Sequence, residues 1–75
     1  MRILVIEDEK KVSSFIKRGL EQESYAVDIA EDGIEGQHMA EVNEYDAIIL
    51  DIMLPKKNGL DVLKDVKAAG VKTPI

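Results

Sequence analysis

The sequence predicts an α/β fold in which the order β-α-β-α-β-α builds a parallel three-stranded sheet with helices on both faces. Two observations lead to this prediction. Short apolar runs alternate with segments whose apolar residues recur at helical spacing. Two of the apolar runs are followed at once by acidic residues, which is typical of strands whose carboxyl ends form the ligand crevice of an open sheet. Right-handed crossovers through the helices then make neighbouring strands parallel.

The first strand is predicted over residues 2–6, a short apolar run that ends at the acidic residues Glu7, Asp8 and Glu9. An amphipathic helix is predicted over residues 9–21, because four apolar residues recur there at helical spacing: Val12, Phe15, Ile16 and Leu20. We expect this apolar face to pack on the sheet and the basic residues of the helix to form a solvated face.

The second strand is predicted over residues 25–30, where Asp28 interrupts the apolar residues and indicates a less covered strand near the sheet edge. Asp32 then offers an N-cap oxygen to a helix over residues 33–42, with Glu35 placed as in a capping box. Small residues on one face of this helix are expected to let it approach the sheet closely: Gly33, Gly36 and Ala40.

His38 is the only histidine of the chain and would be a natural ligand or acid-base group. It falls in the middle of the second predicted helix, and the chain has no cysteine or second histidine to complete such a site. We therefore interpret His38 as a residue of the helix surface.

The third strand is predicted over residues 47–50, an unbroken apolar run that indicates a central parallel strand covered on both faces. Asp51 follows it directly and could bind a metal, accept a proton or act as a nucleophile, whereas an isolated Asp here would only cap the next turn. Pro55 and the Asn58-Gly59 pair are expected to fix the loop that follows.

A third helix is predicted over residues 59–69, with Asn58 as its N-cap and Gly70 as its stop. Its predicted buried residues are Leu60, Leu63 and Val66. Residues 71–75 return toward the sheet, where a fourth strand would begin.

Placing the first strand between the other two gives the order 2-1-3 of the flavodoxin-like arrangement, with its crevice between strands one and three. That order brings Glu7, Asp8 and Asp51 together. Carboxylates at one rim repel each other unless a hard cation or a raised pKa offsets their charge. The sequence therefore predicts a Mg²⁺ site at this rim.

The composition excludes several classes of protein. A net charge of −5 argues against direct binding to nucleic acid or to an anionic membrane surface. The lack of cysteine excludes disulfides and thiolate metal sites and is compatible with a reducing cytoplasm. No apolar run is long enough for a signal peptide or a membrane span, so we expect one small cytoplasmic domain or part of one.

Several short motifs together resemble the receiver domain of two-component response regulators, over the whole of residues 1–75. They are the acidic pair after the first strand, the Asp32-Gly33 turn, the 45–51 strand that ends in Asp51, and Met53-Leu54-Pro55 with Asn58-Gly59. The Met-Leu-Pro loop is similar in particular to that of OmpR/PhoB-type transcriptional regulators. The resemblance implies the CheY-like form of the flavodoxin-like fold.

The resemblance implies that Asp51 is the phosphoacceptor, which takes a phosphoryl group from the phosphohistidine of a sensor histidine kinase. It implies a Mg²⁺ ion held by the carboxylates of Asp8 and Asp51 and by the backbone carbonyl of Met53, with Glu7 in the outer shell or in contact through water. The chain is then a signalling phosphoacceptor and not an enzyme. Its parent protein would control DNA binding and transcription through this phosphorylation.

The resemblance further implies that the chain is the N-terminal part of a receiver domain. The family's hydroxyl residue after the fourth strand, its lysine after the fifth strand and the DNA-binding domain would all lie beyond Ile75. Lys56 and Lys57 are not given the role of that lysine. We expect a weakened Mg²⁺ site, poor phosphorylation, and self-association either through the unpaired edge of the third strand or through receiver dimerisation.

Three other readings are open. A chain that serves only as a self-association module would respond neither to Mg²⁺ nor to a phosphodonor. A phosphatase with an aspartate nucleophile would have a second Asp two residues after the first, where this chain has Met53. A dinucleotide-binding half-domain would have a glycine-rich turn after the first strand, where the acidic residues of this chain would repel phosphates.

Overall fold

The computed structural model describes residues 1–75 and contains three strands and three helices that alternate along the chain. β1 (Arg2–Ile6) lies in the centre of the sheet and pairs in parallel with β2 (Ala26–Ala30) on one side and β3 (Ala47–Leu50) on the other. The predicted strand order 2-1-3 and the edge position of β2 are therefore confirmed.

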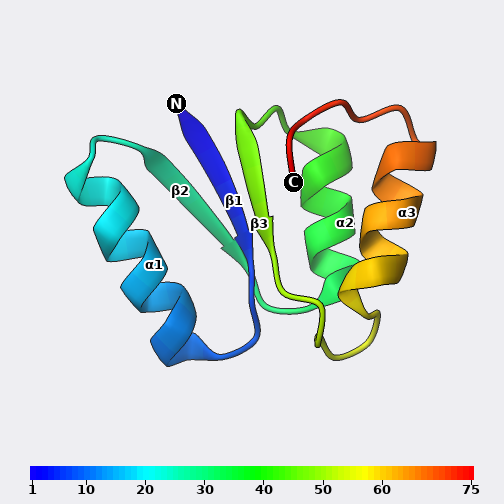
Figure 1. The fold of residues 1–75 in the computed structure, drawn as a ribbon, viewed down its shortest axis with the longest axis horizontal. Coiled ribbons are helices and arrows are strands. Elements are labelled where there is room, and N and C mark those ends of the chain that lie inside the picture. The colour runs from blue at the N-terminus through cyan, green and yellow to red at the C-terminus, as the bar shows by residue number, and fades with distance from the viewer.

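The helices cover both faces of the sheet (Figure 1). α1 (Lys10–Gln22) packs on one face, and α2 (Gly33–Val42) and α3 (Gly59–Ala68) lie side by side on the other. Every helix and strand begins and ends within one residue of its predicted bounds. None of the helices is both long enough and apolar enough to span a membrane.

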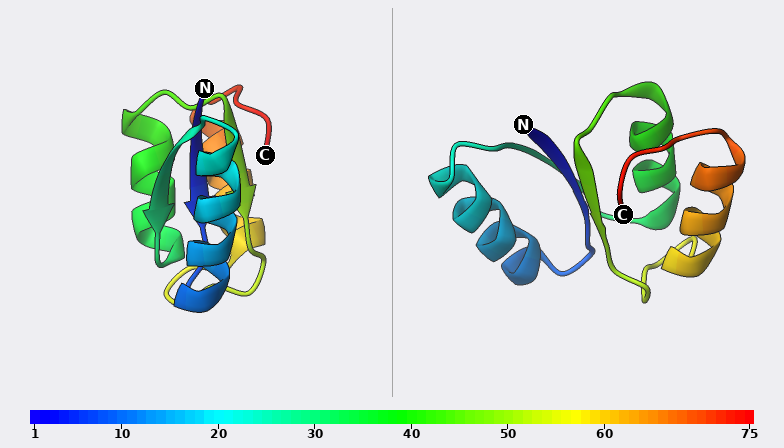
Figure 2. Two further views of the ribbon diagram at one scale, coloured as in Figure 1. Left: turned by 90° about the vertical axis from the view of Figure 1, so that its left-hand side faces the viewer. Right: turned by 45° about the horizontal axis from the view of Figure 1, so that its top comes forward.

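The apolar core has two parts, one on each side of the sheet. The right-hand view of Figure 2 shows α1 on one side of the strands and α2 and α3 on the other. The smaller part lies under α1 and is built on Ile3, Val5 and Val27. The larger part lies under α2 and α3 and consists of Leu4, Ile6, Ala30, Ala40, Tyr45, Ile48, Val62 and Val66. Alternate residues of β1 thus enter opposite halves of the core, as the two-residue period of a strand requires.

Two helix faces differ from the prediction. On α1, Ile16 and Leu20 pack against the sheet, but Val12 and Phe15 are exposed, because α1 lies over β1 and β2 only. On α3, Val62 is buried in place of Leu60, which is 60% exposed. The buried stripe of α3 runs through Gly59, Val62 and Val66, so Leu60 falls on the neighbouring face.

The prediction that β3 is a central strand covered on both faces is wrong. β1 holds the centre, and β3 forms an edge of the sheet. No helix covers β3 on the α1 side, and Ile49 is 39% exposed there. The C-terminal residues lie along the outer edge of β3, where the Ile48 N–H donates to the Pro74 carbonyl at 2.8 Å.

Gly36 sets how closely α2 approaches β1. A Cβ atom at this position would lie 2.7 Å from two side-chain carbon atoms of Ile6, which is itself buried. Gly36→Ala is therefore expected to lower the free energy of unfolding by about 1–3 kcal/mol through overpacking. Chemical denaturation tests this expectation. Gly19→Ala on the open surface of α1 is the matched control, because nothing lies within 4 Å of its Cβ position and it is expected to be neutral or stabilising.

Candidate functional site

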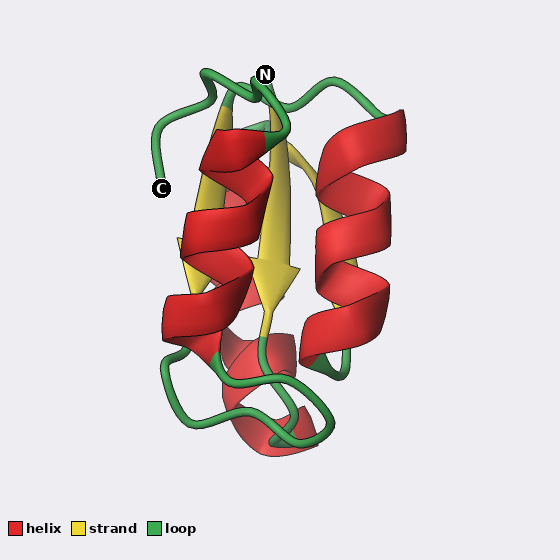
Figure 3. Ribbon diagram, turned by 90° about the vertical axis from the view of Figure 1, so that its right-hand side faces the viewer, coloured by secondary structure: helices red, strands yellow, loops and turns green.

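The carboxyl ends of β1 and β3 bring three carboxylates together. Ile6 and Leu50 are register partners, and the Asp51 N–H donates to the Ile6 carbonyl at 3.1 Å, so the residues that follow the two strands are neighbours. One carboxylate oxygen from each of Glu7, Asp8 and Asp51 lies within 4.8 Å of the others. Figure 3 shows the loops that follow the strands gathered at this end of the sheet. The predicted meeting of these residues is confirmed.

Glu7 is the buried member of this acidic cluster, with an exposed fraction of 8%. Burial, followed by its hydrogen bond to Asp51 and the negative charges of Asp51 and Asp8, raises its pKa from the ordinary 4.5 to about 7. No basic side chain forms an ion pair with any of the three carboxylates. The cluster therefore has an excess of negative charge and offers only hard oxygen donors, which fits a Mg²⁺ ion.

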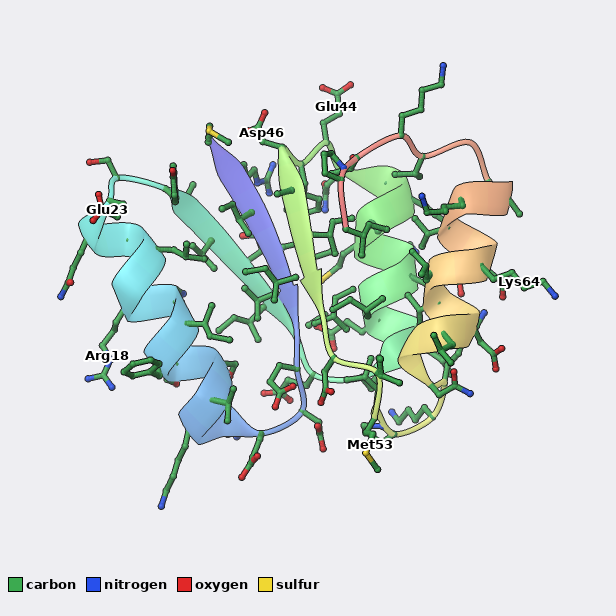
Figure 4. All side chains as sticks on the ribbon, viewed as in Figure 1. Arg18, Glu23, Glu44, Asp46, Met53 and Lys64 are labelled. Atoms are coloured by element: carbon green, nitrogen blue, oxygen red, sulfur yellow. The ribbon has the colours of Figure 1, made fainter.

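Asp51 has a second interaction that orients its side chain. Its Oδ1 accepts a hydrogen bond from the Met53 N–H at 3.2 Å, so Asp51 does cap the turn that follows it, as the simpler reading expected. The other neighbour of this carboxylate is Glu7, whose protonated side chain hydrogen-bonds to Asp51. The side chain of Met53 is 84% exposed and projects from the end of the sheet (Figure 4), so only the backbone of Met53 is turned toward the acidic cluster.

The next helix has its own cap. The Asn58 side-chain oxygen accepts from the Asp61 N–H at 3.0 Å, as predicted, and this leaves Asp51 without a role in capping α3. In the same way Asp32 accepts from the Glu35 N–H at 2.8 Å and caps α2. His38 is exposed on α2 and is not part of the acidic cluster, which agrees with its interpretation as a surface residue.

The two lysines of the loop after Asp51 do not reach the acidic cluster. Lys56 Nζ lies 3.5 Å from Asp32 Oδ2, and Lys57 Nζ donates to Gln37 and Asp65. Neither lysine pairs with Asp51.

One contact of this loop was not predicted from the sequence. The Gly33 N–H donates to the Pro55 carbonyl at 3.3 Å, and a Cβ placed on Gly33 would lie nearest to Lys57, so Gly33 lies against the loop. The only feature of the sequence that pointed to this contact was a glycine at the first position of α2, where helix propensity does not favour glycine. That signal does not say which segment approaches it.

The chain matches the family model of the response regulator receiver domain over residues 3–75. The transcriptional regulatory proteins CusR of Escherichia coli K12 and DltR of Streptococcus agalactiae are 43% and 49% identical to it over all 75 residues. These alignments cover 100% of this chain but only 33% and 34% of the two relatives. The chain thus spans about a third of the length of the curated relatives that it matches.

Solved structures agree with this family. The receiver domain of a Francisella response regulator has a TM-score of 0.93 and 34% identity, with 97% of this chain and 60% of that chain covered. The Thermotoga maritima response regulator TrrA, solved with Mg²⁺ and BeF, has a TM-score of 0.85 and 37% identity, with 89% and 58% covered. TrrA has also been solved in complex with the histidine kinase ThkA; that match has a TM-score of 0.83 and 37% identity, with 89% and 58% covered.

The predicted resemblance to receivers of OmpR-type transcriptional regulators is confirmed by these matches. The strand order, the acidic cluster and the match over nearly every residue lead to one conclusion: the chain belongs to the response regulator receiver domain family.

Proposed function

We propose that this chain is the phosphoacceptor of a two-component response regulator, with Asp51 as the residue that a histidine kinase phosphorylates in the presence of Mg²⁺. The observation that carries the proposal is the acidic cluster, in which Asp51 faces Glu7 and Asp8 within 4.8 Å and no cation of the protein balances them. The kinase complex of TrrA and its structure with Mg²⁺ support the choice of partner and metal.

The side chain of Asp51 is set up for this reaction by its unequal oxygens. Oδ1 is held by the Met53 N–H, which leaves Oδ2 as the oxygen that would attack phosphorus in line. The new O–P bond forms as the P–N bond of the phosphohistidine breaks. The electron pair of that bond leaves with the imidazole nitrogen, and the product is an aspartyl phosphate.

Mg²⁺, when bound, would neutralise the charge on the phosphoryl oxygens. Asp8 and Asp51 would hold it directly, together with the backbone carbonyl of Met53, and Glu7 would contact it through water. Mg²⁺ in proteins keeps several waters and takes one or two carboxylates, which fits a cluster with one buried and two more accessible acids.

The longer parent protein is proposed to be a transcription regulator, of which these residues form the N-terminal part of the receiver domain. The names of CusR and DltR support this proposal. About 1.5–2 added negative charges on Asp51 would reset the neighbouring loops and so change the faces that contact other domains. The chain itself is a signalling phosphoacceptor and not an enzyme that turns over a separate substrate.

A second candidate function is self-association through the open edge of β3. The Ile48 N–H is paired with Pro74, but the backbone groups of Leu50, which the strand alternation directs to the same side, have no partner. Beside this edge the apolar side chains of Ile49, Ile52 and Leu60 are 39%, 56% and 60% exposed. Open edges with apolar surroundings pair with other chains.

Asp51→Asn is expected to abolish phosphorylation, because an amide is not a nucleophile of this kind. Incubation with Mg²⁺ and acetyl phosphate should add one phosphoryl group to a minor fraction of the wild-type chains, detected in the intact mass, and none to the variant. The Asp61→Asn variant is the control, since Asp61 lies on α3 and is expected to leave the adduct unchanged. An equal adduct in Asp51→Asn, or none in the wild type, would contradict the proposal.

Glu7 is expected to make the metal-free protein less stable as pH rises. Because its folded-state pKa of about 7 exceeds the ordinary 4.5, its contribution is complete below about pH 4.5 and is lost as pH passes through 7. The difference between these two pKa values corresponds to a loss of about 3 kcal/mol, measured by denaturation in EDTA across this range. Glu7→Gln should flatten the profile, and a profile unchanged by the substitution would show that another group causes it.

Ile49→Lys is expected to prevent self-association, because a charge beside the free edge opposes pairing with a second chain. Sedimentation should show concentration-dependent dimers for the wild type and monomers for this variant. Val42→Lys places the same charge at an exposed position on α2 and should still form dimers. A wild type that remains monomeric at high concentration would remove this second candidate.

A further inference from the structure

The loop between β3 and α3 (residues 51–58) is held against the start of α2 by a backbone contact at Gly33. A Cβ atom on Gly33 would lie 1.9 Å from the carbonyl oxygen of Lys57 and 2.8 Å from its carbonyl carbon. Its N–H donates to the Pro55 carbonyl at 3.3 Å. Real Cβ atoms do not approach backbone this closely, so the loop can occupy this position only when residue 33 is glycine.

Gly59 closes the other end of the loop in the same manner. Its N–H donates to the Ile52 carbonyl at 2.7 Å, and a Cβ atom would lie 2.2 Å from the carbonyl oxygen of Asp51. Two close contacts to glycine therefore flank the backbone of Met53, which is the backbone that we propose as a metal ligand.

The side chain of Lys57 joins the loop to both helices. Its Nζ donates to Gln37 on α2 and to Asp65 on α3, and the pKa of Asp65 is lowered by the hydrogen bond and the charge of this lysine. The Lys57 side chain is largely covered, with 25% exposed. The loop is thus attached to α2 by its backbone and to the α2–α3 pair by one ammonium group.

The neighbours of Gly33 separate its role from that of Gly36 on the same helix. Gly36 faces the side chain of Ile6 and so sets the distance between α2 and β1. The three atoms nearest to a Cβ placed on Gly33 all belong to Lys57. The prediction that both glycines serve helix–sheet packing therefore holds for Gly36 only.

We propose that Gly33 is a positioning residue for the acidic cluster, with Lys57 as its side-chain counterpart. Gly33 lets the loop lie against α2 in the one place where the Met53 backbone turns toward Asp51, as the Met53 N–H bond to Asp51 Oδ1 shows. A larger residue pushes the loop away from α2 and moves the Met53 carbonyl relative to Asp8 and Asp51. The proposal rests on the proposed Mg²⁺ site, and it assigns Gly33 and Lys57 the role of holding the loop that carries the metal ligands.

The test compares Mg²⁺ affinity in Gly33→Ala and the wild type by calorimetric titration, together with the thermal midpoint in EDTA and in Mg²⁺. Loss of residues that support metal ligands weakens binding roughly tenfold to a hundredfold, and we expect Gly33→Ala to fall in this range. Lys57→Met should weaken binding in the same direction by a smaller factor, and it decides the question if Gly33→Ala does not fold.

Val66→Ala is the matched control for a loss of stability alone. Val66 is a buried residue of α3 outside the loop, so its truncation should lower the midpoint in EDTA but keep the rise produced by Mg²⁺. Gly33→Ala should lose most of that rise. Wild-type Mg²⁺ affinity in both Gly33→Ala and Lys57→Met would overturn the positioning role alone, whereas a wild type without any response to Mg²⁺ would overturn the metal site as well.

Discussion

The parallel pairing of β1 with β3 is the interaction on which the other features of the molecule depend. This pairing imposes electrostatic repulsion between carboxylates at one end of the sheet. β1 lies in register with both neighbours, and its last residue, Ile6, is paired with Leu50. The burial of these apolar residues stabilises the sheet, and the same register forces Glu7 and Asp51 together at its rim. The repulsion between these carboxylates therefore offsets part of the free energy by which burial of the core stabilises the fold.

The raised pKa of Glu7 shows how the metal-free chain responds to this repulsion. Protonation of Glu7 removes one charge from the cluster at neutral pH and below. A bound cation would offset the repulsion between the carboxylates while Glu7 is deprotonated. Metal binding and proton release are therefore coupled at this site, because the same charge is neutralised by one or the other.

Most of the fold could be predicted because its signals are local. Apolar runs, helical spacing and N-cap residues lie within a few positions of one another, and they placed all six elements and the caps Asp32 and Asn58. The strand ends also predicted the acidic cluster, because topology alone brings them to one rim. The exposed Phe15 and Leu60 were not predicted, since helical spacing shows that a face is apolar but not which neighbour covers it.

The support of the site could not be predicted for a related reason. Gly33 and Lys57 are distant in the sequence, and their contact joins two backbones without any pattern of side chains. Helix propensity identifies the glycine at the start of α2 as unfavourable, but it does not predict which loop packs against this glycine. Such contacts are visible only when the chain is folded, and here they fix the loop that carries Asp51.

Two acids at opposite ends of the sheet, the partly exposed Asp28 and the buried Glu7, have pKa values shifted in opposite directions. Near the amino ends, Asp28 Oδ2 accepts from the Tyr45 hydroxyl and from Arg2 Nη2, each at 2.8 Å, and these bonds lower its pKa. At the carboxyl ends, Glu7 has no such donor from a basic or hydroxyl side chain, and its pKa rises. Side chains of the protein thus stabilise the negative charge of Asp28, whereas no basic side chain stabilises that of Glu7. The missing positive charge marks the place where binding energy from a cation is available.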